Sequence, residues 1–204
     1  MKTGSDIIQS VSEDKWGRKM GTMINLIQSI IRSSEVCPKI LVYSQWQDSL
    51  SMLRVILECA WRQSLMGREV DINCILMTRD HNYRSTTVFK ESANIPVLLM
   101  LLQQGNNGLD MSIASHIIIM EPILSASEGG VGNSRLAMEA QAVARVQRIG
   151  QTQETFVHYV IADDTIESKM WVFVFSATLA TLSSRKGKSV RVKAGRMERS
   201  RARR

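Results

Sequence analysis

Short apolar runs that alternate with amphipathic stretches constrain the fold of this chain most strongly. Each run is rich in aliphatic and β-branched side chains, which is typical of a strand buried on both faces. The runs lie at residues 39–44, 70–76, 96–102, 116–120 and 155–161. Between them, apolar residues recur at helical spacing. This alternation predicts an α/β domain with a parallel sheet covered by helices on both faces.

The amphipathic stretches predict where the helices and the domain limits lie. Helices are expected at residues 19–33, 46–62, 84–92 and 163–182, and one from about 141 to a stop at Gly150. Residues 1–18 are polar and irregular, and 125–134 are rich in Gly and Ser, which favours a loop. One domain over 19–183 is expected, followed by a tail over 184–204.

The positive charge of the chain is concentrated in that tail. Residues 185–204 contain ten Lys or Arg and one acidic residue, Glu198, a net charge of +9. The other residues hold sixteen of the 26 basic and eighteen of the 19 acidic side chains, a net charge of −2. Such a segment is expected to be disordered. It suits either sequence-independent binding of nucleic acid or a nuclear-import address.

Several classes of protein do not fit the sequence. No uncharged run of about 18 apolar residues is present, so no membrane span is expected. The start of the chain lacks the apolar run of a secretory signal. Cys37, Cys59 and Cys74 are widely spaced and form no CxxC pair, so reduced structural thiols and no metal site are expected.

The stretch QAVARVQRIGQT, at 141–152, is the strongest candidate for chemistry. Gln141, Arg145 and Arg148 stand at i, i+4 and i+7, positions that share one face of a helix. Two arginines on one face suit a site where phosphate charge is neutralised, because the guanidinium is planar and always charged. The alternative is a surface helix whose arginines are merely solvated.

The sequence of this stretch resembles motif VI of the SNF2 family of DNA-dependent ATPases, in helicase superfamily two. Two other stretches resemble motifs of the same family in the same order. KILVYSQW, at 39–46, is similar to motif IV, and LLQQGNNGLDMSIASHIIIMEP, at 101–122, is similar to motif V. Within the family, IMEPILS and RVQRIGQT are most similar to the SNF2, histone-linker, PHD and RING helicase group of ubiquitin ligases. The longer segment SASEGGVGNSRLAMEA and the wording GNNGLD depart from the common pattern.

The resemblance implies a role for each matching residue. Arg145 and Arg148 are expected to be catalytic arginine fingers that reach ATP on another lobe, with Gln141 orienting them. Gly108 and Asp110 are expected near the nucleotide, with Asp110 at the start of a short helix. The remaining matches are expected to contact DNA: Ser44, Gln45 and Gly105. For Ser44 the alternative is that its hydroxyl only caps the helix that follows.

The fold implied is the second RecA-like lobe of a superfamily-two helicase. The sequence holds neither a GxxxxGK[ST] loop nor a DEAH-like acidic run, so ATP and Mg²⁺ would be bound mainly by a first lobe outside these residues. The implied parent protein is a nuclear DNA translocase acting on duplex DNA or chromatin, with ubiquitin-conjugating partners engaged by other domains. Two alternatives remain: a non-catalytic DNA- or protein-binding module, and an α/β domain with no nucleotide role.

Overall fold

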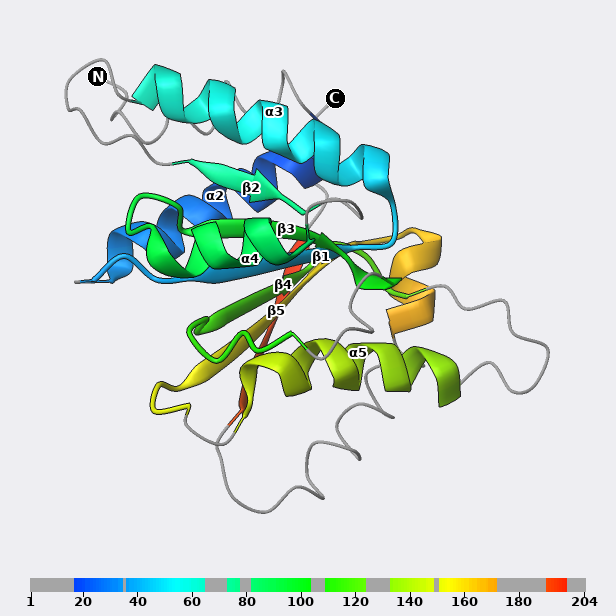
Figure 1. The fold of residues 1–204 in the computed structure, drawn as a ribbon. Helices are drawn as coiled ribbons and strands as arrows, with labels where there is room; N and C mark the ends of the chain where they lie inside the picture. Colours follow the sequence, from blue (N-terminus) through cyan, green and yellow to red (C-terminus); the bar gives the residue numbers. More distant parts are fainter. Residues whose placement is uncertain are drawn as a thin grey trace.

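A computed structural model shows a single sheet of six parallel strands, in the order β2-β3-β1-β4-β5-β6 (Figure 1). It describes residues 17–34, 36–64, 73–77, 82–103, 109–123, 133–148, 151–171 and 190–197. Because every strand pair is parallel, each connection must cross back over a face of the sheet. The carboxyl ends of the strands therefore meet at one edge.

The first five strands along the chain lie within the predicted apolar runs or extend them by one residue, and a sixth lies outside these runs. They are β1 (Ile40–Ser44), β2 (Cys74–Leu76), β3 (Val97–Leu101), β4 (His116–Ile119), β5 (Thr155–Ala162) and β6 (Val190–Met197). The helices are α2 (Arg18–Ser33), α3 (Gln47–Ser64), α4 (Asn82–Glu91) and α5 (Asn133–Val146), and residues 166–171 are also helical. No helix among the described residues is long and apolar enough to span a membrane.

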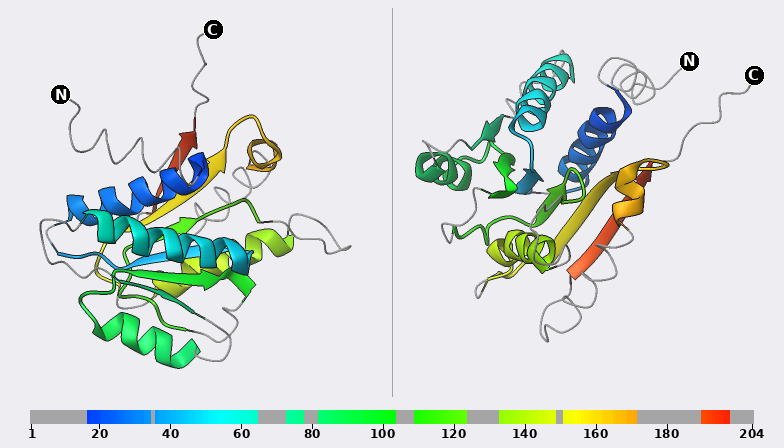
Figure 2. Two further views of the ribbon diagram at one scale, coloured as in Figure 1. Left: turned by 90° about the horizontal axis from the view of Figure 1, so that it is seen from above. Right: turned by 90° about the vertical axis from the view of Figure 1, so that its right-hand side faces the viewer.

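Helices cover both faces of the sheet, as the sequence predicts. Even-numbered residues of β1, such as Val42, pack with α2 and α3, whereas odd-numbered residues, such as Tyr43, pack with α4 and α5. Figure 2 shows α2 and α3 on one side of the strands and α5 on the other. Burial of this kind stabilises by about 25 cal/mol per Å² of apolar surface, so the two cores hold the sheet between its helices.

Lys39, the residue immediately before β1, stabilises the end of α4. Its ammonium group donates to three carbonyl oxygens, those of Phe89 at 2.7 Å, Ser92 at 2.5 Å and Ile95 at 2.9 Å. A cation at a helix C-terminus satisfies carbonyls that have no partner in the helix and complements the helix dipole. Burial lowers the pKa of Lys39 from its ordinary value, and the nearby Cys37 opposes this effect.

Two local predictions differ from the structure, and a third falls on a residue that the structure does not describe. α5 begins at Asn133 and ends at Val146, so Arg148 lies beyond the helix rather than on one face with Gln141. Gly150, predicted as the helix stop, lies outside the described residues. Leu109 and Asp110 do not begin a helix, because a turn at 112–113 follows them directly.

The basic tail also differs from the prediction of disorder. Residues 190–197 form β6, which pairs in parallel with the whole of β5, so the domain extends beyond 183. The sequence VRVKAGRM alternates apolar and basic residues at first, and an alternation with period two suits a strand. The prediction weighed net charge and overlooked this alternation. Residues 184–189 and 198–204 lie outside the described part of the chain.

Candidate functional site

Arg145 is buried, contrary to the expectation that it projects from the domain. Only 4% of the residue is exposed. Its Nη1 donates a long hydrogen bond of 3.4 Å to the hydroxyl of Tyr43, and its guanidinium carbon lies 6.0 Å from the centre of the Tyr43 ring. Gln141, one turn earlier on α5, is exposed. The two residues therefore do not act together on one solvent-facing surface.

Arg148 occupies a turn just after α5 and is only partly buried. Its backbone N–H donates to the carbonyl oxygen of Val146 at 3.0 Å, and its own carbonyl accepts from the N–H of Gln151 at 3.1 Å. These two bonds fix the backbone of the turn. These hydrogen bonds hold the backbone of Arg148 in place, while its side chain is partly exposed at the surface of the domain.

Asp110 lies on the segment that faces this turn. Its carboxylate accepts a hydrogen bond of 3.1 Å from the backbone N–H of Ser112. That bond is the main reason why the pKa of Asp110 lies below its ordinary value, and the positive charges of Lys90 and Arg148 lower it further. The N–H of Met111 donates to the carbonyl of Arg145 at 3.0 Å, which joins this segment to the end of α5. A hydrogen bond therefore joins the segment that carries Asp110 to the last turn of α5, three residues before Arg148. The roles of Asp110 and Arg148 near a nucleotide stay predictions.

Gln151 completes this arrangement, and the sequence did not single it out. Only 6% of the residue is exposed. Its amide nitrogen donates to the carbonyl oxygens of Ser112 at 2.7 Å and Ala114 at 2.9 Å, and its amide oxygen accepts from the N–H of Gln153 at 2.9 Å. A polar residue directly after the predicted helix stop was the only signal available. We call Asp110, Arg148 and Gln151 the arginine-turn site.

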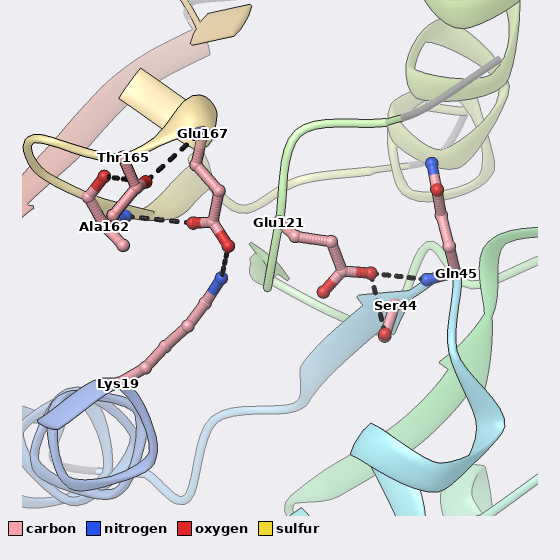
Figure 3. A network of polar contacts seen from close by, with 7 residues as sticks. All are labelled: Lys19, Ser44, Gln45, Glu121, Ala162, Thr165 and Glu167. Carbon is pink, nitrogen blue, oxygen red and sulfur yellow. Dashed lines mark hydrogen bonds and ion pairs between the residues drawn. The ribbon is translucent and has the colours of Figure 1, made fainter. Parts of the chain in front are cut away.

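A second polar cluster lies at the carboxyl edge of the sheet, around Glu121 (Figure 3). The Oε1 atom of Glu121 accepts hydrogen bonds from the Ser44 hydroxyl at 2.7 Å and from the backbone N–H of Gln45 at 2.6 Å. The Ser44 oxygen in turn accepts from the N–H of Trp46 at 3.0 Å, where α3 begins. Ser44 is 2% exposed, so its hydroxyl faces the interior, and its bond to the N–H of Trp46 forms a local turn just before α3.

The Gln45 side chain behaves differently from its backbone. It extends away from Glu121 in Figure 3, and its amide nitrogen is buried without a hydrogen-bond partner among the residues that the structure describes. A buried donor without an acceptor costs about 1–3 kcal/mol. Gly105 and Gly108, the other residues predicted to approach DNA and nucleotide, lie outside the described residues. The structure therefore places only the Ser44–Gln45 turn of that predicted set.

The carboxyl edge extends to the residues that follow β5. Glu167 forms a 2.6 Å ion pair with Lys19, at the start of α2. It also accepts a 2.9 Å hydrogen bond from the N–H of Ala162. The Thr165 hydroxyl caps residues 166–171 by accepting from the N–H of Glu167 at 3.1 Å. Lys19 and Glu167 also lie close enough to affect the ionisation of Glu121.

The burial of Glu121 leads to a testable prediction about how the stability of the fold depends on pH. Burial raises its pKa from the ordinary 4.5, against its two hydrogen bonds and Lys19, with Glu167 adding to the rise. The folded state therefore binds the proton more tightly than the unfolded state, so stability should fall as pH rises from 4.5 through the raised pKa. Glu121→Gln keeps an oxygen acceptor and removes the charge, so it should flatten this dependence.

The measurement is urea unfolding of both proteins between about pH 4 and pH 7. Glu91→Gln, at the exposed end of α4, is the control, and should retain the wild-type dependence. Identical pH profiles for wild type and Glu121→Gln would show that Glu121 is not destabilised by its burial.

The described residues hold no group of three His, Cys, Asp or Glu side chains that could bind a metal ion. The arginine-turn site provides one guanidinium, from Arg148, and one carboxylate, from Asp110, on backbone held by hydrogen bonds. That pair suits a nucleotide, because the guanidinium can neutralise phosphate charge and the carboxylate can accept from a ribose hydroxyl. A Mg²⁺ ion would need ligands from elsewhere.

Comparison with known proteins finds relatives that match most of this chain. No family model matches the chain. It is 32% identical over 146 residues to the mouse E3 ubiquitin-protein ligase SHPRH, covering 72% of this chain and 8% of that protein. It is 28% identical over 161 residues to the DNA repair protein rad8 of Schizosaccharomyces pombe, covering 76% of this chain and 12% of rad8. It is 30% identical over 132 residues to the Arabidopsis thaliana DNA repair protein RAD5A, covering 65% of this chain and 11% of RAD5A.

The fold is also that of a solved domain. The crystal structure of the C-terminal part of the Fun30 ATPase domain matches with a TM-score of 0.60 and 21% sequence identity. The match covers 76% of this chain and 44% of that one. This chain thus has a RecA-like α/β fold, and it spans only a small share of the curated relatives that it matches.

Proposed function

Since this chain belongs to the SNF2 family and corresponds to the C-terminal helicase lobe, we propose that it supplies an arginine to ATP bound on a companion first lobe. The observation that carries this proposal is the arginine-turn site, where Arg148 and Asp110 are held on one frame. In phosphoryl transfer the protein mainly positions groups and neutralises developing charge. Arg148 would neutralise charge on the phosphates, and Asp110 would lie near the ribose.

The companion lobe would bind most of the ATP and its Mg²⁺. When bound there, Mg²⁺ would supply positive charge that offsets the charge of the phosphates. The residues of this lobe would complete the site only when the two lobes close, which makes turnover depend on a domain motion. Exposed Gln141, at the edge of α5, would lie near the closing surface.

DNA is the substrate that we propose for the movement coupled to ATP hydrolysis. The relatives named as DNA repair proteins support duplex DNA or chromatin as the partner and the nucleus as the location. The relative named as an E3 ubiquitin-protein ligase supports a parent protein that also engages ubiquitin-conjugating enzymes through other domains. Within this lobe Gly105 and the basic residues of 185–204 would meet the DNA backbone.

The isolated chain is expected not to hydrolyse ATP, because it has no phosphate-binding GxxxxGK[ST] loop. The protein that carries both lobes should hydrolyse ATP, and duplex DNA should stimulate it. Phosphate release from each, with and without duplex DNA, is the measurement. Turnover by the isolated chain would refute the division of labour between the lobes. No turnover by the two-lobe protein at any DNA concentration would instead favour a non-catalytic binding module.

A further inference from the structure

The residues of β6 are sorted onto two chemically different faces of the sheet. Register partners in parallel strands share a face, so each β6 position takes the face of its β5 partner. The apolar positions continue the face that packs with α5: Val190, Val192 and Ala194, in register with Thr155, Val157 and Tyr159. The basic positions lie on the opposite face: Arg191, in register with Phe156, and Lys193, in register with His158. Val160 of β5 shares that face and packs with α2 and α3, so we call it the α2 face.

The neighbouring strands surround these basic positions with neutral or weakly basic residues. His116 of β4 stacks on Phe156 with ring centres 4.9 Å apart, and its Nδ1 lies 3.0 Å from Nε2 of His158. Within the described strands β4, β5 and β6, no position on the α2 face is Asp or Glu. His116 and Phe156 are partly exposed, so this face reaches the surface where the strands begin. Figure 2 shows β6 at the opposite end of the sheet from α4.

The spacing of the two basic positions suits a ligand with repeating negative charge. Positions two apart on a strand are separated by roughly 6.6 Å. The charges of one DNA strand follow one another about every 3.4 Å along the helix axis, so Arg191 and Lys193 can meet separate phosphates. We propose that β6 binds the phosphate backbone of duplex DNA as a formed strand, through Arg191 and Lys193 on the α2 face. This inference rests on the proposed function, because it names which basic residues of the lobe meet DNA.

A formed strand leads to an expectation that a structureless basic tail does not share. In such a tail, every Lys and Arg of 185–204 would contribute alike, because counterion release depends on the number of phosphates neutralised. In the strand, Arg196 is in register with Ile161 on the opposite face from Arg191. Only Arg191 and Lys193 can therefore meet the same stretch of DNA backbone. Because pairing with β5 already orders them, they bind with a smaller loss of conformational entropy.

A salt titration of the affinity of the 204-residue chain for DNA tests this proposal, with two duplexes of unrelated sequence as probes. Arg191→Gln combined with Lys193→Gln removes both contacts. The slope of log affinity against log salt should become shallower by about 1.8, since each phosphate contact contributes about 0.9. At about 0.1 M salt the affinity should fall roughly tenfold or more, and equally for both duplexes.

Arg196→Gln combined with Arg199→Gln is the matched control. It removes the same charge from the same segment, at one position on the opposite face of β6 and one beyond its end. The slope should change by less than about 0.5. Urea unfolding should give both double variants midpoints near that of the wild type, because glutamine retains the backbone groups that pair β6 with β5.

Hydrogen exchange on the wild-type chain decides the question if the variant of Arg191 and Lys193 fails to fold. The amides of β6 should keep or gain protection when duplex DNA binds, because the strand stays paired with β5. Loss of that protection on binding would show that DNA releases β6 from the sheet, and would overturn the proposal.

Equal changes of slope in the two double variants would also overturn it, and would leave 185–204 as a basic tail without a preferred face. Polyglutamate that binds the wild type more tightly than DNA does, with this binding lost in the variant of Arg191 and Lys193, would assign the face to an acidic protein instead. The proposed function fails separately, because full turnover by Arg148→Ala would remove the finger without changing these titrations. A wild-type chain with no affinity for duplex DNA at low salt would remove DNA as a ligand of this lobe, and the proposed contact with it.

Discussion

Replacing Arg148 with alanine in the protein that carries both lobes is expected to lower ATP turnover at least about a hundredfold. An arginine that neutralises charge on a transferring phosphoryl group acts mainly in the transition state, so kcat should fall much more than the affinity for ATP. The fold should be little affected, because Arg148 is only partly buried and its two described backbone bonds remain in the variant.

The control for this experiment is Arg54→Ala. Arg54 is an exposed arginine on α3 that forms an ion pair of 2.9 Å with Glu58, and such exposed pairs contribute little to stability. This variant should keep its turnover and its melting temperature. Turnover by Arg148→Ala within about threefold of the wild type would show that Arg148 does not act as a finger.

Arg145→Ala is a poorer test of catalysis than the sequence suggested. The sequence predicted that both arginines project from one helix face, so that neither substitution would disturb the fold. Because Arg145 is buried against Tyr43, its removal leaves a cavity and a buried hydroxyl that loses a partner. A loss of activity in Arg145→Ala would therefore combine unfolding with any effect on the reaction.

The arrangement of the fold was predictable because it depends on local patterns. Five strands and the helices between them follow apolar runs and helical spacing, and the α/β class with a parallel sheet follows from their alternation. The sixth strand was missed for a physical reason. Its first residues alternate apolar and basic, a pattern that the high net charge of 185–204 concealed.

The candidate site was predictable in its residue types and less so in its geometry. The motifs indicated Asp110 and Arg148, and a hydrogen bond from Met111 to Arg145 joins the segments on which they lie. Helical spacing could not show that α5 ends at Val146, because a helix end depends on tertiary contacts of its last turn. The inward direction of Ser44 depends on Glu121, which lies far away in the sequence and adjacent only across the parallel sheet.

Gln151 shows most clearly that sequence patterns do not predict the geometry of the site, and it provides a strong test of the structure. Its side chain bonds carbonyl groups of Ser112 and Ala114, which no sequence pattern places beside it. Gln151→Ala would leave these carbonyls without that donor in a buried environment, and each such loss costs about 1–3 kcal/mol. The variant is therefore expected to lower the free energy of unfolding by about 2–5 kcal/mol.

Gln153→Ala is the matched control, because Gln153 is the same residue type, two positions away and exposed. Its bond to Gln151 uses its backbone N–H, which alanine retains, so the unfolding midpoint should stay near that of the wild type. Urea unfolding of the 204-residue chain measures both variants, and an unchanged slope would show that the shift reports stability. Equal midpoints for Gln151→Ala and Gln153→Ala would mean that the segment carrying Asp110 is not held by Gln151. The position of the Asp110 segment beside the end of α5 would then have to depend on the Met111–Arg145 bond instead.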